Sequence, residues 1–234
     1  MNGYRVRYLT NYFKYISCLL FVIGAVFAPL TAGAQDLKLH PLESYSVKYK
    51  CEGNATGEKI QVSQDYGKKV CLKENLQITM PEVGSVKRNE KMVSWIENGE
   101  RWIVVVNLDD NTGTKFKDPT FAKISESMKG KDPMEFNKQQ LMGMGGIVKG
   151  QKTVSGQQCS MWSFPQGIDM CITDDFIMLE TVANVQDLAI KETAVEVKKN
   201  SPEPAGLCDL TGIKITERDI SQMMQQQAPA QPGQ

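Results

Sequence analysis

Residues 92–106 of this 234-residue chain read MVSWIENGERWIVVV. Asn98-Gly99 stands between two runs of β-branched, aromatic and other apolar residues, and this dipeptide is the strongest short signal for a two-residue hairpin turn. The second run, 102–106, is apolar at every position, so a strand made of it presents apolar side chains on both faces. Such a strand needs cover on both sides, and we therefore expect a sheet with other segments packed across it.

Most of the remaining chain consists of short segments that suit β-strands. Tyr45, Val47, Tyr49 and Cys51 alternate with polar residues, which is the pattern of a strand with one buried and one solvated face. The same reasoning, with Gly-, Pro-, Asp- and Asn-rich turns between segments, predicts strands in the ranges 59–63, 69–73, 147–154, 158–164, 168–173, 176–182 and 189–197.

Three stretches carry helix signals. Asp118-Pro119 and Asp132-Pro133 each place an N-cap residue before a proline that suits the first helical position, and apolar residues at helical spacing follow. Thr216, with Asp219 three residues later, predicts a capping box and a short last helix. Strands, a central helical pair and further strands predict an α+β fold: a strongly curved antiparallel β-sheet, or half-barrel, with short helices packed in its concave face.

The N-terminus determines where the protein is expected to work. Basic residues without an acid precede an apolar run, and Ala32-Gly33-Ala34 provides the small residues that signal peptidase needs. The apolar run is shorter than the roughly 20 residues that span a bilayer, and no second run follows. We therefore expect an exported protein that does not span the membrane. Its expected divisions are a signal peptide, 1–34, cleaved before Gln35; a single domain, 35–224; and a disordered Gln/Pro/Ala tail, 225–234.

The charge balance excludes some partners. The full chain holds 27 Lys+Arg and 27 Asp+Glu, and removing Arg5, Arg7 and Lys14 with the signal leaves 24 against 27, a net charge of −3. This is an ordinary charge for a soluble protein, and it provides no attraction to nucleic acid.

Five cysteines remain after the signal, and in an oxidising compartment they are expected to form disulfides. Cys159 and Cys171 flank a Pro-Gln-Gly turn, and a hairpin centred on its proline places them opposite one another within bridging distance. Cys51 and Cys71 are the expected second pair, which leaves Cys208 unpaired.

The residue types and their spacing do not suggest catalysis, a metal site or a cofactor. The single histidine, His40, lies near the expected cleavage site, where a disordered position offers no orienting partner, so we expect it to be inert. Asp109-Asp110 and Asp174-Asp175 suit turns. The methionines lack the histidines and the repeated spacing of a copper site, and flexible apolar packing explains them better.

Three tryptophans are the candidate ligand-binding residues: Trp95, Trp102 and Trp162. An indole ring offers a large apolar face with one hydrogen-bond donor, which suits a groove for an acyl chain. Ordinary core packing is the alternative for each of them.

The second half of the chain resembles a known family. It is similar to an uncharacterised exported domain family allied to the periplasmic lipoprotein-carrier (LolA/LolB-like) superfamily. Phe176 stands where glycine is common in that family, and Thr211 stands where a proline is expected. The resemblance implies the half-barrel fold and the Gram-negative periplasm, and it marks no catalytic residues. The residues that carry it are Gly150, Val154, Gly156, Cys159, Trp162, Cys171-Ile172-Thr173-Asp174-Asp175, Ile177, Leu179-Glu180 and Leu210-Thr211-Gly212-Ile213.

Two functions remain open at this point. The first is a periplasmic binding protein that holds a lipid, an acylated peptide or another apolar ligand in a half-barrel groove; the apolar strand and the Met- and Phe-bearing helices suggest it. The alternative is a cell-envelope protein–protein interaction module with a fully packed core and no small ligand. Under either function, we do not expect the protein to be an enzyme.

Overall fold

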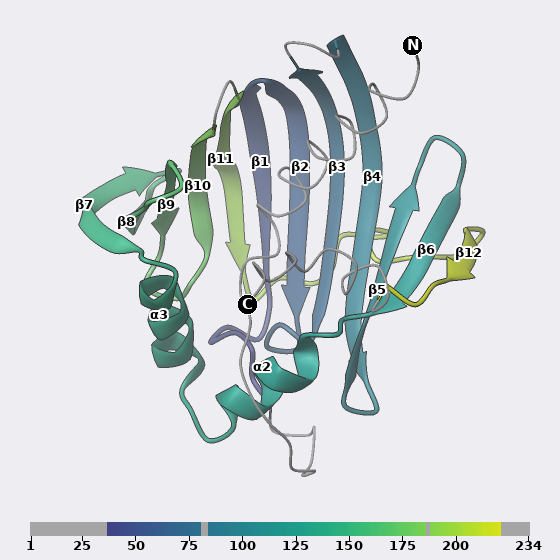
Figure 1. Cartoon of the computed structure of the whole chain (residues 1–234), viewed down its shortest axis with the longest axis horizontal. Coiled ribbons are helices and arrows are strands. Elements are labelled where there is room, and N and C mark those ends of the chain that lie inside the picture. The colour runs from purple at the N-terminus through teal and green to yellow at the C-terminus, as the bar shows by residue number, and fades with distance from the viewer. Residues whose placement is uncertain (1–36, 81–83, 186–187, 221–234) are drawn as a thin grey trace, which may run out of the picture.

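The computed structural model describes residues 37–80, 84–185 and 188–220. The expected signal peptide and C-terminal tail lie outside these residues. Within them the chain forms one large curved sheet that does not close, with two short helices near one end of the strands (Figure 1). This confirms the predicted α+β half-barrel.

Six strands precede the helical pair, and six follow it. The first six are β1 (Tyr45–Gly53), β2 (Ala55–Gln64), β3 (Lys69–Met80), β4 (Gly84–Glu97), β5 (Glu100–Asn107) and β6 (Thr112–Lys117). The helices are α2 (Phe121–Met128) and α3 (Pro133–Gly143). The last strands are β7 (Ile147–Val154), β8 (Gln157–Phe164), β9 (Ile168–Ile172), β10 (Met178–Val185), β11 (Leu188–Lys199) and β12 (Lys214–Glu217).

The sheet has the strand order β12-β6-β5-β4-β3-β2-β1-β11-β10-β9-β8-β7. β1 pairs with both β2 and β11, so the first described strand lies in the middle of the sheet. The pairs are antiparallel except β12 with β6, which is parallel.

The hairpin predicted at Asn98-Gly99 is present. β4 and β5 pair up to Glu97 opposite Glu100. Asn98 and Gly99 adopt φ values of 53° and 76°, the left-handed conformations that a type I′ turn requires.

Strand β5 is buried on both faces, as its sequence predicts. Val104 and Val106 are fully buried on one face, and Ile103 on the other is 2% exposed. Helix α2 packs against β5, but the second cover is the C-terminal segment 201–213, whose Ile213 lies beside Val106. We call this segment the strap and the sheet face beneath it the outer face.

A disulfide between Cys71 and Cys208 fastens the strap, so the predicted Cys51–Cys71 pair is wrong and Cys51 is the free thiol. The predicted pair cannot form because successive side chains of a pleated strand point to opposite faces of the sheet. Cys51 lies level with Gly57 and Leu76 and points to the opposite face from Cys71, which packs with Leu207 of the strap. We call that opposite face of β1–β6 the inner face.

The predicted disulfide between Cys159 and Cys171 is present, with Cα atoms 5.4 Å apart. The hairpin register differs from the prediction, however. Met161, not Cys159, lies directly opposite Cys171, so the hairpin is centred on Gln166 and the bonded cysteines are diagonal neighbours.

The three helix predictions have different outcomes: one helix start is confirmed, one helix begins later than predicted, and the third helix does not form. The Asp132 side chain accepts from the backbone N–H of Met134 (2.8 Å) and of Glu135 (3.1 Å), which confirms the α3 cap. The Asp118 carboxylate instead binds Thr120 within a turn, and α2 starts only at Phe121.

The helix predicted to begin at Thr216 is wrong. Residues 214–217 form β12, because the strap places them beside β6, where they pair with its backbone. Residues 221–234, into which that helix was predicted to continue, lie outside the described residues.

Candidate functional site

The structure does not bring the three candidate tryptophans together. Trp95 and Trp102 lie opposite one another on the outer face, where Trp95 packs against the strap and the Trp102 ring carries Lys115 Nζ 3.9 Å from its centre. Trp162 is 6% exposed and packs with Leu141 of α3. They therefore do not line one common groove.

A row of charged side chains crosses the inner face instead. Lys59 of β2 lies opposite Glu74 of β3, which lies opposite Glu90 of β4. Lys59 Nζ is 2.5 Å from Glu192 Oε2 of β11 and so reaches across β1. Arg88 Nε is 2.6 Å from Glu74 Oε1 and 2.9 Å from Glu90 Oε2. We call these five residues the charged row.

The centre of the charged row is removed from water. The Lys59 side chain is fully buried, and Glu74 is 4% exposed. Burial raises the pKa of Glu74, although the charges of Arg88 and Lys59 act in the opposite direction. Within the described ranges, Glu74 Oε1 accepts no hydrogen bond, because Arg88 Nε approaches it without an aligned N–H. Burying a carboxylate oxygen without a hydrogen-bond donor is energetically unfavourable.

Apolar side chains adjoin the charged row on the side of the β1–β2 turn. They form a buried cluster, which we call the inner apolar cluster, of Cys51, Ala55, Leu76, Ile78 and Met80. Burial, with Glu192 nearby, raises the pKa of the Cys51 thiol to about 12, so this cysteine behaves as a small apolar residue.

The two helices lie away from this part of the sheet. α2 packs on β5, and α3 packs through Leu141 on the cluster of β8 and β9 residues that contains Trp162. Figure 1 shows both helices at the lower end of the strands, and within the described ranges no helix or strand crosses the inner face of β2–β4 above them.

His40 is held in place, so the expectation of a disordered histidine is wrong. The backbone N–H of Leu42 donates to His40 Nδ1 (3.1 Å), and Nε2 lies 3.3 Å from the Phe176 carbonyl oxygen. The ring lies 4.5 Å from that of Tyr45. Burial lowers the pKa of His40, and the arrangement ties residues before β1 to the loop before β10.

A polar cavity of about 620 Å³ opens near that loop. Asp175 pairs with Lys199 (2.5 Å) and accepts from Thr173. Burial acts to raise the pKa of Asp175, but these hydrogen bonds and the Lys199 charge together outweigh it and lower that pKa. Its charged pair is thus already satisfied, and the described residues contain no cluster of metal-ligating side chains. The lining residues are Met134, Gln157, Gln158, Thr173, Asp174, Asp175 and Lys199.

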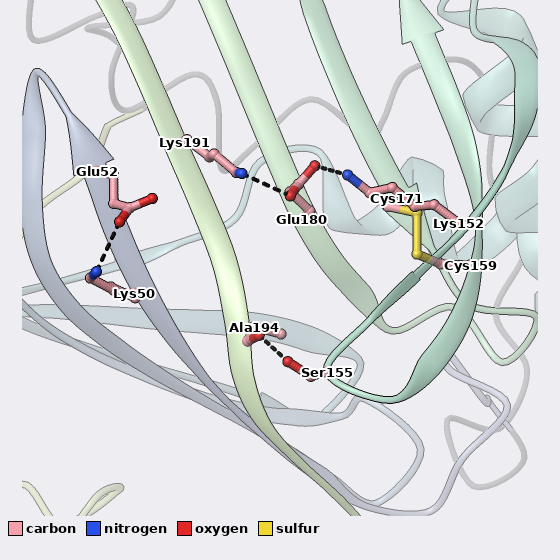
Figure 2. A network of polar contacts seen from close by, with 9 residues as sticks. All are labelled: Lys50, Glu52, Lys152, Ser155, Cys159, Cys171, Glu180, Lys191 and Ala194. Atoms are coloured by element: carbon pink, nitrogen blue, oxygen red, sulfur yellow. Dashed lines mark hydrogen bonds and ion pairs between the residues drawn. A yellow bond between two sulfur atoms is a disulfide. The ribbon is translucent and has the colours of Figure 1, made fainter.

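The β7–β8 hairpin is fastened to its neighbours by structural contacts. Figure 2 shows Glu180 between Lys152 and Lys191, the latter 3.3 Å away, beside the Cys159–Cys171 disulfide. At the hairpin turn, the Ser155 hydroxyl donates to the carbonyl oxygen of Ala194. These contacts fix the position of the hairpin.

Sequence reasoning did not identify the charged row. Its members are polar residues at alternating strand positions, which is the pattern of a solvated face, so the sequence carries no signal that this face is buried.

No family model and no curated protein matches the chain. Among solved structures it is similar to an uncharacterised conserved protein from Thermus thermophilus, with a TM-score of 0.48 and 10% identity over 76% of this chain and 92% of the other. A β-barrel-like protein of a domain of unknown function from Brucella abortus has a TM-score of 0.45 and 10% identity over 69% and 100% of the two chains. MucB has a TM-score of 0.37 and 12% identity over 73% and 59%.

Two further observations bear on location. The two disulfides are typical of an exported protein, since reducing compartments keep thiols free. Among the described residues, no helix is both long and apolar enough to cross a membrane.

Proposed function

We propose that this protein is a periplasmic binding protein of the lipoprotein-carrier (LolA/LolB-like) type that holds an amphipathic ligand on the inner face of its sheet. The observation that carries the proposal is that the inner apolar cluster adjoins the charged row on the inner face of the sheet, where the centre of the row and the cluster are both buried. The protein acts by binding and needs no cofactor and no catalytic group.

The charged row changes the kind of ligand that the sequence suggested. A hydrocarbon chain beside the buried Lys59 and Glu74 would give neither charge a hydrogen bond, which is unfavourable. The apolar part of a ligand placed against Leu76 and Ile78 would instead gain roughly 25 cal/mol for each Å² of its own apolar surface removed from water. A ligand with an apolar part and a polar part therefore fits better than a purely apolar one.

The test is a binding measurement with a variant on each face. A fluorescent dodecyl amphiphile should bind the purified mature protein saturably, and organic extraction followed by mass spectrometry should release an amphiphile that co-purifies. Ile78→Ser in the inner apolar cluster should weaken binding several-fold, whereas Val195→Ser, at a position 57% exposed, should leave it unchanged. A folded protein, by circular dichroism, that neither binds the probe nor releases an amphiphile contradicts the proposal.

One observation favours the second function, an envelope interaction module. β7 ends the strand order, and Ile147 and Val148 on it are each 54% exposed. An edge strand of this kind can accept an extended segment of a partner protein. Site-specific photo-crosslinking from position 148 in the periplasm should then give one discrete adduct that Ile147→Asp abolishes. If no adduct forms, this alternative is wrong.

A further inference from the structure

The polar cavity of about 620 Å³ is lined by four parts of the chain: α3, the start of β8, the turn between β9 and β10, and the end of β11. Its volume falls within the range of about 300–1,000 Å³ that is typical of sites for small molecules. We propose that this cavity binds a guanidinium group on an aliphatic stem, with the carboxylate of Asp174 as its ionic partner. The cavity shares no lining residue with the charged row or the inner apolar cluster, so this inference goes beyond the proposed function.

Asp174 provides the case for a cation. Its side chain is exposed, and within the described ranges it has no hydrogen-bond or ion-pair partner. The neighbouring Asp175 differs, because Lys199 at 2.5 Å and the Thr173 hydroxyl already satisfy its carboxylate. The lining of the cavity therefore contains two carboxylates against one ammonium, and the unbalanced negative charge lies on Asp174.

The turn that carries Asp174 is held by hydrogen bonds on both sides of it. The backbone N–H of Thr173 donates to the carbonyl oxygen of Ile177 (2.9 Å), and the N–H of Ile177 donates to the Thr173 hydroxyl (2.9 Å). The N–H of Phe176 donates to the Thr173 carbonyl oxygen (3.0 Å), and His40 Nε2 lies 3.3 Å from the Phe176 carbonyl oxygen. Because the turn is ordered without a ligand, binding at Asp174 requires little further ordering of the backbone.

Two other lining residues favour a guanidinium over a simple ammonium. The side-chain amide of the half-buried Gln157 has no partner among the described residues, so its oxygen is free to accept a hydrogen bond. A planar guanidinium has five N–H donors, so it can bind a carboxylate with two of them and still donate to an amide. Met134, which is 38% exposed, offers an apolar surface for the methylene groups of the stem. An arginine side chain of a partner protein and a free guanidinium compound share this chemistry.

The first experiment compares three butyl compounds on the full mature protein: butylguanidinium, butylammonium and the neutral butylurea. NMR titration of the amide signals measures the affinity and also locates the site. We expect butylguanidinium to shift the signals of Gln157 and Asp174 and to bind about three- to fivefold more tightly than butylammonium, with butylurea weaker than both. Added salt should weaken the binding of the two cations, because the carboxylate is exposed.

Asp174→Asn and Asp169→Asn form the first matched pair of variants. Both remove one negative charge from an exposed position, but Asp169 on β9 does not line the cavity. Asp174→Asn should weaken butylguanidinium binding about three- to fivefold, whereas Asp169→Asn should leave it unchanged. Circular dichroism checks that both variants are folded.

Lys199→Gln and Lys198→Gln form the second pair, which tests for a gain of affinity. Removing Lys199 leaves Asp175 without its cation, so Lys199→Gln should tighten butylguanidinium binding about three- to fivefold. Lys198 pairs with Glu196 at 2.5 Å and does not line the cavity, so Lys198→Gln should have no effect. A tighter complex cannot result from partial unfolding of the variant.

The outcomes are independent of amphiphile binding on the inner face. Equal binding of butylurea, signal shifts elsewhere in the protein, or unchanged affinity in Asp174→Asn would each overturn the cation site. Equal binding of butylammonium would overturn the assignment to a guanidinium. The tripeptide acetyl-Gly-Arg-Gly-amide then distinguishes the two sources: tighter binding than butylguanidinium supports an arginine of a partner protein, and equal or weaker binding supports a free guanidinium compound.

Discussion

Cys71 is bonded to Cys208 across 137 residues of sequence, and this bond holds the strap on the outer face of the sheet. Leu207 and Cys208 pack there on Val62 and Val93, and Lys91 Nζ donates to the carbonyl oxygen of Asp209. The disulfide therefore closes the apolar core on the side that the helices do not reach.

Replacing both cysteines of this bond by serine should lower the free energy of unfolding by roughly 2–5 kcal/mol, because the unfolded chain regains the freedom of a very long loop. Cys159→Ser with Cys171→Ser opens a loop with a separation of only 12 residues and should cost less. Urea denaturation of the two double variants measures both values. A larger loss in the Cys159/Cys171 variant would show that the strap contributes little.

Cys51 should be the one cysteine of the mature protein that is free and unreactive. Burial raises the pKa of its thiol to about 12, so very little thiolate exists at pH 8. Iodoacetamide should modify no cysteine in the native protein and should modify Cys51 alone after denaturation without reductant. Alkylation of Cys208 in either state, followed by peptide mapping, would contradict the observed connectivity.

His40 should make stability depend on pH below neutrality. Burial lowers its pKa from the ordinary value of 6.5, so the unfolded chain binds the proton more readily than the folded one. Its contribution is therefore present above pH 6.5 and is lost as the pH falls through 6.5 toward the lowered folded value. Protonation also removes the acceptor at Nδ1 that Leu42 uses.

Urea denaturation of the unmodified protein and of His40→Gln between pH 7.5 and 5 measures this effect. The unmodified protein should lose stability relative to the variant as the pH falls, and an NMR titration should place the His40 pKa below 6.5. Parallel pH profiles for the two proteins would show that the imidazole does not titrate with folding.

Gly57 and Gly84 should respond differently to alanine although both have positive φ, 139° and 89°. A Cβ on Gly57 would lie 2.1 Å from the carbonyl oxygen of Asn75, whereas a Cβ on Gly84 meets nothing within 4 Å. Gly84→Ala should cost about 1–2 kcal/mol for the backbone conformation alone, and Gly57→Ala roughly 2–5 kcal/mol because the neighbouring strand must also move. Thermal denaturation of both variants provides the comparison.

Much of the fold could be predicted because its signals are local. Asn98-Gly99 set the hairpin, Asp132 set the start of α3, and alternation set most strands. Phe176, noted because glycine is common at its position in the family that the chain resembles, has φ 61°, the conformation that glycine adopts most easily.

The features that sequence reasoning missed depend on contacts between distant residues. The Cys71–Cys208 pair required knowing that residues after 200 return over β3 and β4, and no local pattern states this. Lys59 and Glu74 have the alternation of solvated residues, yet both are buried. The polarity of individual positions could be read from the sequence, but not which polar positions would lose their water.

The central position of β1 has a consequence for how the chain acquires its structure. Its edge toward β2 is completed by the next residues of the chain, but its edge toward β11 remains open until about 140 further residues have been synthesised or translocated. Pairing across such a separation makes folding slow, on the order of milliseconds to seconds for sheets dominated by non-local contacts. A chain delivered through a membrane N-terminus first would thus carry an incomplete sheet that needs protection from association during transit.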